Sequence, residues 1–178
     1  MKYITIIGSR KITREEHITL RSLADHFHEH GFTLRSGGAY GADSSINHLS
    51  NIEIYIPWDG YNNLYHNGKT IFMLKYLPDQ YLASKKVSEI HPKFEKLSRG
   101  AKLLQTRNIY QIIGYKGKEG TPSECVIYAA DHDKNGEPVG GTRTAVMYAR
   151  SLGIPTINIR LIDGLLLEPL SRMEWNNV

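Results

Sequence analysis

The sequence has 178 residues, the length of one ordinary domain, and its 40% hydrophobic and 22% charged residues are typical of a chain that folds. No apolar run reaches the ~20 residues of a membrane-spanning helix, no signal-peptide pattern opens the chain, and one cysteine cannot form an internal disulfide, so we expect a cytoplasmic protein with no membrane partner. The net charge of +4 favours polyanions only weakly, because the basic residues form no block of five.

The first 57 residues alternate between apolar runs and helical patterns. The expected elements are strands at residues 2–7, 32–34 and 52–57, and helices at about 13–31 and 42–49. Thr13 stands three residues before Glu16, which is a capping box that opens the first of these helices. Strands and helices that alternate with short connections are typical of a parallel sheet flanked by helices.

The second part of the chain is less regular. We interpret residues 58–92 as an irregular insertion with short helices that packs over one edge of the sheet. The elements expected after it are helices at 95–113 and 142–151, strands at 125–130 and 155–159, and a short closing helix at 165–178. No shift in composition marks a second domain. The prediction is therefore one α/β domain over residues 1–178, with a mostly parallel sheet and helices on both faces.

Unusual residues follow the predicted strands, at the edge where ligands of open α/β sheets bind. Glycine lets an oxygen-rich ligand reach backbone N–H groups, and a helix N-terminus adds donors and a partial positive charge. Hydroxyl and guanidinium groups can pair with phosphate oxygens. The residues of this predicted phosphate site are Gly8, Ser9, Arg10, Ser36, Gly37, Gly38, Gly41, Asp43, Gly140, Gly141, Thr142 and Arg143.

Each of these features also has a simpler explanation. A Gly-Gly pair after a strand can be no more than a tight turn. Asp43 can be a carboxylate in the first turn of a helix, or it can grip a ribose hydroxyl or a base amine. The glycine spacing matches neither the dinucleotide fingerprint nor the P-loop, so we expect no cofactor.

Two further groups of residues allow alternative interpretations. His26 and His30 share one helix face, but no other ligand completes a metal site, so we expect a solvated face and no metal. Trp58, Tyr61 and Tyr65 can stack nucleic-acid bases, although core packing explains aromatic residues more often.

The order of these segments resembles the DprA/Smf DNA-processing proteins and, more broadly, the SLOG superfamily of Rossmann-like nucleotide-binding proteins, which includes the LOG phosphoribohydrolases. The segments that carry the resemblance are GSR at 8–10, SGGAYGAD at 36–43, Arg107-Asn108 with Gly114, and GGT at 140–142 with Ala145. The resemblance covers roughly residues 1–159, and the insertion looks like that of compact members carried by bacteriophages.

The resemblance implies a Rossmann-like fold whose glycine-rich pocket takes phosphate from a nucleotide or from single-stranded DNA. It adds Arg107 and Asn108 to the expected lining of that pocket, and it implies a homodimer. As in DprA, the expected partner is therefore single-stranded DNA, with a small nucleotide as the alternative.

The LOG enzymes use a PGGxGTxxE motif whose glutamate assists N-glycosidic cleavage. In this sequence Arg143 stands at the third glycine and Met147 at the glutamate, and a methionine can neither donate a proton nor stabilise an oxocarbenium ion. We therefore favour a non-enzymatic, DprA-like binder of single-stranded DNA. The alternatives are a small-nucleotide sensor or sequestering protein, an N-glycosidase of nucleoside monophosphates, and a protein-interaction module that has kept only the fold.

Overall fold

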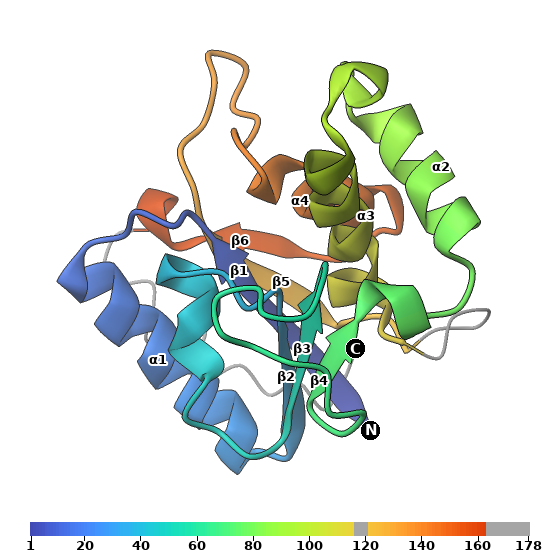
Figure 1. Cartoon of the computed structure of the whole chain (residues 1–178). Helices are drawn as coiled ribbons and strands as arrows, with labels where there is room; N and C mark the ends of the chain where they lie inside the picture. The colour runs from blue at the N-terminus through green and yellow to red at the C-terminus, as the bar shows by residue number, and fades with distance from the viewer. Residues whose placement is uncertain (116–120, 163–178) are drawn as a thin grey trace.

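The computed structural model describes residues 1–115 and 121–162, and its centre is a sheet of six parallel strands (Figure 1). The strands are β1 (Lys2–Gly8), β2 (Phe32–Ser36), β3 (Ile52–Ile56), β4 (Ile71–Met73), β5 (Cys125–Ala129) and β6 (Thr156–Asn158). Their order across the sheet is β4-β3-β2-β1-β5-β6, so the direction of winding reverses between β1 and β5.

Helices cover both faces of the sheet. The α-helices are α1 (Arg14–Glu29), α2 (Gln80–Ile90), α3 (Arg99–Ile113) and α4 (Thr142–Ser151). Figure 1 shows α1 on one side of the sheet, together with the 3₁₀ helix η1 (Gly41–Ile46), and the other three helices on the opposite side. The predicted α/β fold, with a parallel sheet and helices on both faces, is confirmed.

The central strands are buried on both sides, and their residues alternate between two hydrophobic cores. In β1, Ile4 and Ile6 face the core under α1, whereas Ile7 faces the core under α2, α3 and α4. In β5, Ile127 faces the core under α1 and Tyr128 faces the core on the opposite side of the sheet. Strands that are covered on both faces need apolar residues at successive positions, which is why these two segments read as continuous apolar runs.

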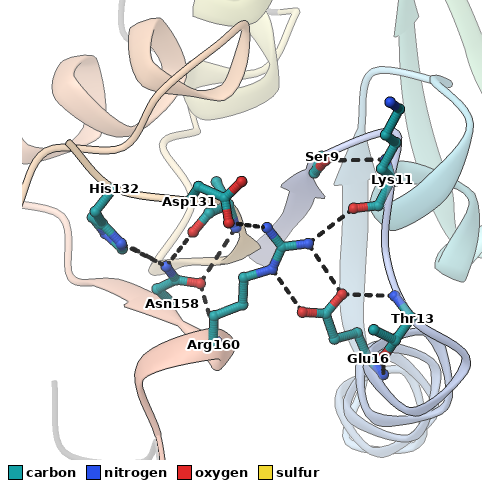
Figure 2. A network of polar contacts seen from close by, with 9 residues as sticks. Ser9, Lys11, Thr13, Glu16, Asp131, His132, Asn158 and Arg160 are labelled. Carbon is teal, nitrogen blue, oxygen red and sulfur yellow. Dashed lines mark hydrogen bonds and ion pairs between the residues drawn. The ribbon is translucent and has the colours of Figure 1, made fainter.

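Polar contacts fix the start of α1. Thr13 Oγ1 accepts a hydrogen bond from the Glu16 backbone N–H at 3.1 Å, and the Glu16 side chain accepts one from the Thr13 N–H at 2.8 Å, which completes the predicted capping box. Arg160, just after β6, donates to Glu16 Oε1 at 2.6 Å, to Asp131 Oδ1 at 2.7 Å and to the Lys11 carbonyl at 2.9 Å (Figure 2). The network joins α1 to the chain segments that follow β5 and β6.

The structure corrects two predicted elements. The α-helix expected at 42–49 is instead η1, in which the Ser44 hydroxyl donates to the Gly41 carbonyl at 2.7 Å, a local bond that competes with α-helical pairing. The segment 58–92 does more than pack over an edge of the sheet. It supplies β4, a strand beyond the five that the sequence predicted, which pairs with β3, and it supplies the helix α2.

Smaller differences concern the ends of elements. The helix expected from residue 95 begins at Arg99, after Ser98, whose hydroxyl accepts from the Ala101 N–H at 3.3 Å. The closing helix predicted at 165–178 lies outside the described residues. Among the helices of the described ranges, none has the length and apolar character needed to cross a membrane. A single domain spanning residues 1–178 stays a prediction.

Candidate functional site

A pocket of about 330 Å³ opens at the carboxyl ends of β1 and β5, where the strand order reverses. Such a switch point is the usual ligand site of an open α/β sheet. Its walls come from the turn after β1, the chain after β5, the helix α3 and the N-terminus of α4. Nine of the fourteen predicted site residues line it, namely Gly8, Ser9, Arg10, Asp43, Arg107, Asn108, Gly140, Gly141 and Thr142.

Asp43 joins two of the predicted loops. Its carboxylate accepts hydrogen bonds from the backbone N–H groups of Gly8 (3.1 Å), Gly37 (2.8 Å) and Ala39 (3.4 Å). Asp43 is buried, with only 3% of its surface exposed. Burial raises the pKa of Asp43, while Arg107 and the three N–H donors act in the opposite direction. These N–H groups therefore point at the protein's own carboxylate, and a ligand anion would have to bind elsewhere in the pocket.

At two positions in the loop after β2, neighbouring atoms come so close to the backbone that only glycine fits. A Cβ on Gly37 would overlap the guanidinium of Arg107 and the side-chain amide of Gln111, so glycine makes room for both side chains of α3. Gly41 has a φ of +79°, which favours glycine, and a Cβ there would overlap the Ser9 carbonyl. Both glycines shape the pocket from behind, and neither belongs to its lining.

The helix α3 supplies buried hydrogen-bond donors to the pocket. Arg107 is 6% exposed and donates through Nη1 to Asn108 Oδ1 at 2.9 Å, while Gln111 is 1% exposed. In the part of the chain that the structure describes, Arg107 Nε and Gln111 Nε2 have no hydrogen-bond partner. A buried donor without an acceptor costs about 1–3 kcal/mol. Because both residues line the pocket, they favour a ligand that brings acceptor oxygens.

The N-terminus of α4 forms the facing wall. Asn108 Nδ2 donates to the Gly141 carbonyl at 3.0 Å, which fixes the Gly-Gly turn against α3. Gly141 is the N-cap and provides no side-chain cap, and space is open around the Cβ position of Gly140. The uncapped N–H groups and the helix dipole give this wall a positive potential.

Tyr61 is a pocket residue that lies between two arginines. Its hydroxyl accepts a hydrogen bond from Arg10 Nη2 at 3.2 Å, and its ring centroid is 6.0 Å from the guanidinium carbon of Arg107. The side chain is 6% exposed, so it is a buried wall of the pocket. Of the other two aromatic residues considered for stacking, Trp58 is 38% exposed and Tyr65 is 63% exposed.

The remaining predicted residues lie outside the lining. Ser36 is buried and its hydroxyl accepts from the Gly38 N–H at 3.3 Å, which places both in the scaffold behind the pocket. Arg143 turns toward Glu137, with 4.0 Å between Nη1 and Oε2. Met147 is also outside the lining, and the Asp131 carboxylate, although at the pocket, pairs with Arg160.

Sequence reasoning missed Leu104, Gln105 and Gln111 as pocket residues. Together with Arg107 and Asn108 they recur at helical spacing along one face of α3, so that pattern was the available signal. The residue type of Gln111 gave no such signal, because a glutamine in a helix is more often exposed to solvent and favours the helix only by its propensity.

His26 lies in the last turn of α1, and His30 is the C-cap of this helix. The His26 and His30 rings are 4.2 Å apart between centroids, and His30 Nδ1 lies 2.8 Å from the His26 carbonyl oxygen. Across residues 1–115 and 121–162, no three His, Cys, Asp or Glu side chains are grouped so that they could hold a metal ion.

Two comparisons with known proteins find similarity, one in sequence and one in structure. Residues 1–55 match the family model described as DNA recombination-mediator protein A. A DNA processing protein A from Helicobacter pylori, solved in a study of its single-stranded DNA binding mode, is similar in structure, with a TM-score of 0.55, 18% sequence identity, and coverage of 96% of this chain and 73% of that one. A search of curated protein sequences finds no match. The chain is thus DprA-like, by sequence over its first 55 residues and by its Rossmann-like fold over nearly its whole length.

Proposed function

We propose that the protein is a DprA-like factor that binds single-stranded DNA through a nucleotide phosphate held in the pocket at β1 and β5. The observation that carries the proposal is a pair of pocket-lining residues, Arg107 and Gln111, that each hold a buried donor without a partner, at Nε and at Nε2. Phosphate oxygens are strong acceptors, and a guanidinium suits them in charge and geometry. The similar protein from Helicobacter pylori is described by its single-stranded DNA binding, which supports the same ligand here.

The arrangement of donors suggests how a phosphate would lie. Arg107 and Gln111 would donate from α3, and the uncapped N-terminus of α4 at Gly141 would face them across the pocket. Arg10 would add a second positive charge from the turn after β1. The predicted roles of Ser36, Gly37, Gly38, Gly41 and Arg143 would then be indirect, through the shape of the loops that surround the phosphate.

A second candidate function is binding of a free nucleotide. Its support is the volume of about 330 Å³, which lies at the small end of ligand pockets and suits one nucleotide. N-glycosidase chemistry has less support, because the carboxylates of Asp43 and Asp131 are engaged by N–H groups and by Arg160. A cytoplasmic homodimer of the compact bacteriophage type stays a prediction.

Fluorescence anisotropy of labelled oligothymidylate at two ionic strengths tests the proposal. We expect binding at low salt, with log K falling by about 0.7 per contacted phosphate for each unit of log salt. Arg107→Gln should weaken binding by about tenfold or more, because a hydrogen bond to a charged group contributes about 1.5–3 kcal/mol. The matched control is Arg21→Gln, which removes an exposed charge from α1 on the opposite face.

The outcomes separate the two candidates. Absence of oligonucleotide binding at low salt would refute the single-stranded DNA function. In that case, a thermal shift with a nucleoside monophosphate would support the free-nucleotide function, since a ligand at 100 times its Kd stabilises the fold by about 2.7 kcal/mol. Release of free base from the nucleotide would indicate an enzyme.

A further inference from the structure

The positive surplus of this chain is concentrated in one stretch. Residues 74–102 hold seven of the 22 basic and three of the 18 acidic residues, so their net charge of +4 equals that of the whole chain, and the rest carries 15 of each. The seven basic residues are Lys75, Lys85, Lys86, Lys93, Lys96, Arg99 and Lys102. All of them except Lys102 are exposed. A surface with this imbalance attracts polyanions.

A groove lies within this stretch, between α2 and α3. It has a volume of about 530 Å³, and Tyr81 and Ser84 of α2 face Arg99 and Lys102 of α3 across it. Tyr81 is 79% exposed, which is unusual for an aromatic ring that has only a structural role. An exposed ring beside cations is the arrangement on which single-stranded nucleic acids stack.

Lys102 is held in place at the groove. Its ammonium group pairs with Glu95 Oε2 at 2.8 Å and lies 5.1 Å from the centroid of the Phe94 ring. Glu95 is 81% exposed, so this pair is a surface ion pair of small energy that a phosphate could replace.

An aromatic side chain connects the groove to the pocket. The Trp58 ring packs edge-on against Tyr61 of the pocket, with centroids 5.6 Å apart and planes at 87°. Two carbons of the six-membered ring of Trp58 lie 3.8 Å from the Cβ position of Gly100, which follows Arg99 of the groove in sequence. Trp58 is 38% exposed, and its ring lies between Tyr61 of the pocket and the first turn of α3, the helix that lines the groove.

We propose that the groove between α2 and α3 is a second contact surface for the same nucleic-acid strand. A single strand anchored in the pocket continues over Trp58, a base stacks on Tyr81, and phosphates contact Arg99 and Lys102. The inference rests on the proposed function of the pocket and extends it from one nucleotide to a longer stretch of DNA. The net positive charge of the surface suits the phosphates of a nucleic acid, and its exposed tyrosine rings suit the bases of a single strand.

The test compares a trinucleotide with an oligothymidylate of about 15 nucleotides, a length within the range of known single-strand sites. The variant Arg99→Gln/Lys102→Gln should bind the trinucleotide like the wild type and the long strand about tenfold more weakly, and its salt slope should fall by about 1.4 because two phosphate contacts are lost. Tyr81→Ala should weaken the long strand by about tenfold without changing the slope. Arg21→Gln/Lys69→Gln, which removes two exposed charges elsewhere, is the matched control.

Two results would overturn the inference. One is a wild type that binds both lengths with equal affinity, and the other is a pair of groove variants that bind the long strand no more weakly than the control. The second result would also be obtained if the groove met an acidic protein instead of DNA. Failure of the pocket function looks different, because the wild type would then bind the trinucleotide no better than Arg107→Gln does.

Discussion

Replacing Asp43 by asparagine tests the contact on which the pocket is built. The carboxylate accepts three backbone N–H groups, from Gly8, Gly37 and Ala39, in a site that is 3% exposed. An asparagine offers one oxygen, and its NH₂ group faces at least one N–H as a second donor. A buried donor left without a partner costs about 1–3 kcal/mol, and hydrogen bonds to a charged acceptor contribute about 1.5–3 kcal/mol each. Because removal of the buried charge offsets part of this loss, we expect Asp43→Asn to lower the free energy of unfolding by about 3 kcal/mol.

Urea unfolding followed by intrinsic fluorescence measures this change. A domain with a stability of about 5–15 kcal/mol would remain folded, so both the midpoint and the slope can be determined. Glu29→Gln, an exposed substitution on α1, is the control and should stay within about 0.5 kcal/mol of the wild type. If Asp43→Asn were as stable as that control, the three hydrogen bonds to the carboxylate would not be what joins the loops after β1 and β2.

Three further predictions concern other parts of the structure. Gly37→Ala would place a Cβ against the Arg107 guanidinium, so oligonucleotide binding measured by anisotropy should weaken by about tenfold, and unchanged affinity would contradict the packing. A hydrogen bond from Arg160 lowers the pKa of Glu16. This pair therefore stabilises the fold fully above the ordinary pKa of 4.5, and the stabilisation is lost as the pH falls through the lowered pKa. In unfolding experiments, Glu16→Gln should reduce the loss of stability at acid pH. Burial raises the pKa of the Cys125 thiol to about 12, so a disulfide reagent should modify it only as the protein unfolds, and rapid reaction in native buffer would refute its burial.

The sequence predicted the central strands well because their environment is symmetrical. β1 and β5 have helices on both faces, so nearly every position is apolar and the run is evident without any knowledge of its neighbours. β4 has three residues, Ile71–Met73, which is too short for a periodic pattern. The start of α2 follows Asp79, a residue type that is typical of N-caps, but Asp79 takes a left-handed conformation with φ of +53° and makes no side-chain cap bond.

The site was predictable only in part, for a different reason. The glycines and Asp43 belong to a local motif, and Arg107 and Asn108 came from the resemblance to DprA. Gln111 and Tyr61 owe their places at the pocket to contacts that are distant in sequence, because Gln111 packs against Gly37 and Tyr61 lies between Arg10 and Arg107. The helical spacing from Arg107 and Asn108 places Gln111 on their face of α3, but nothing near Gln111 or Tyr61 in the sequence indicates these distant contacts.

The loop motif and the groups that we propose to bind the ligand therefore belong to different parts of the molecule. Gly37 accommodates the side chains of α3, and Asp43 occupies the N–H groups that a simple glycine-loop model would assign to an anion. In the proposed site the donors then come from the two helices that flank the pocket and from Arg10 in the turn after β1, and α3 contributes the buried ones. Because α3 also begins with Arg99 and Lys102, one helix would carry both the pocket contacts and the groove contacts. A small displacement of α3 should for that reason weaken both contacts together, whereas substitutions at the two ends of α3 should weaken them one at a time.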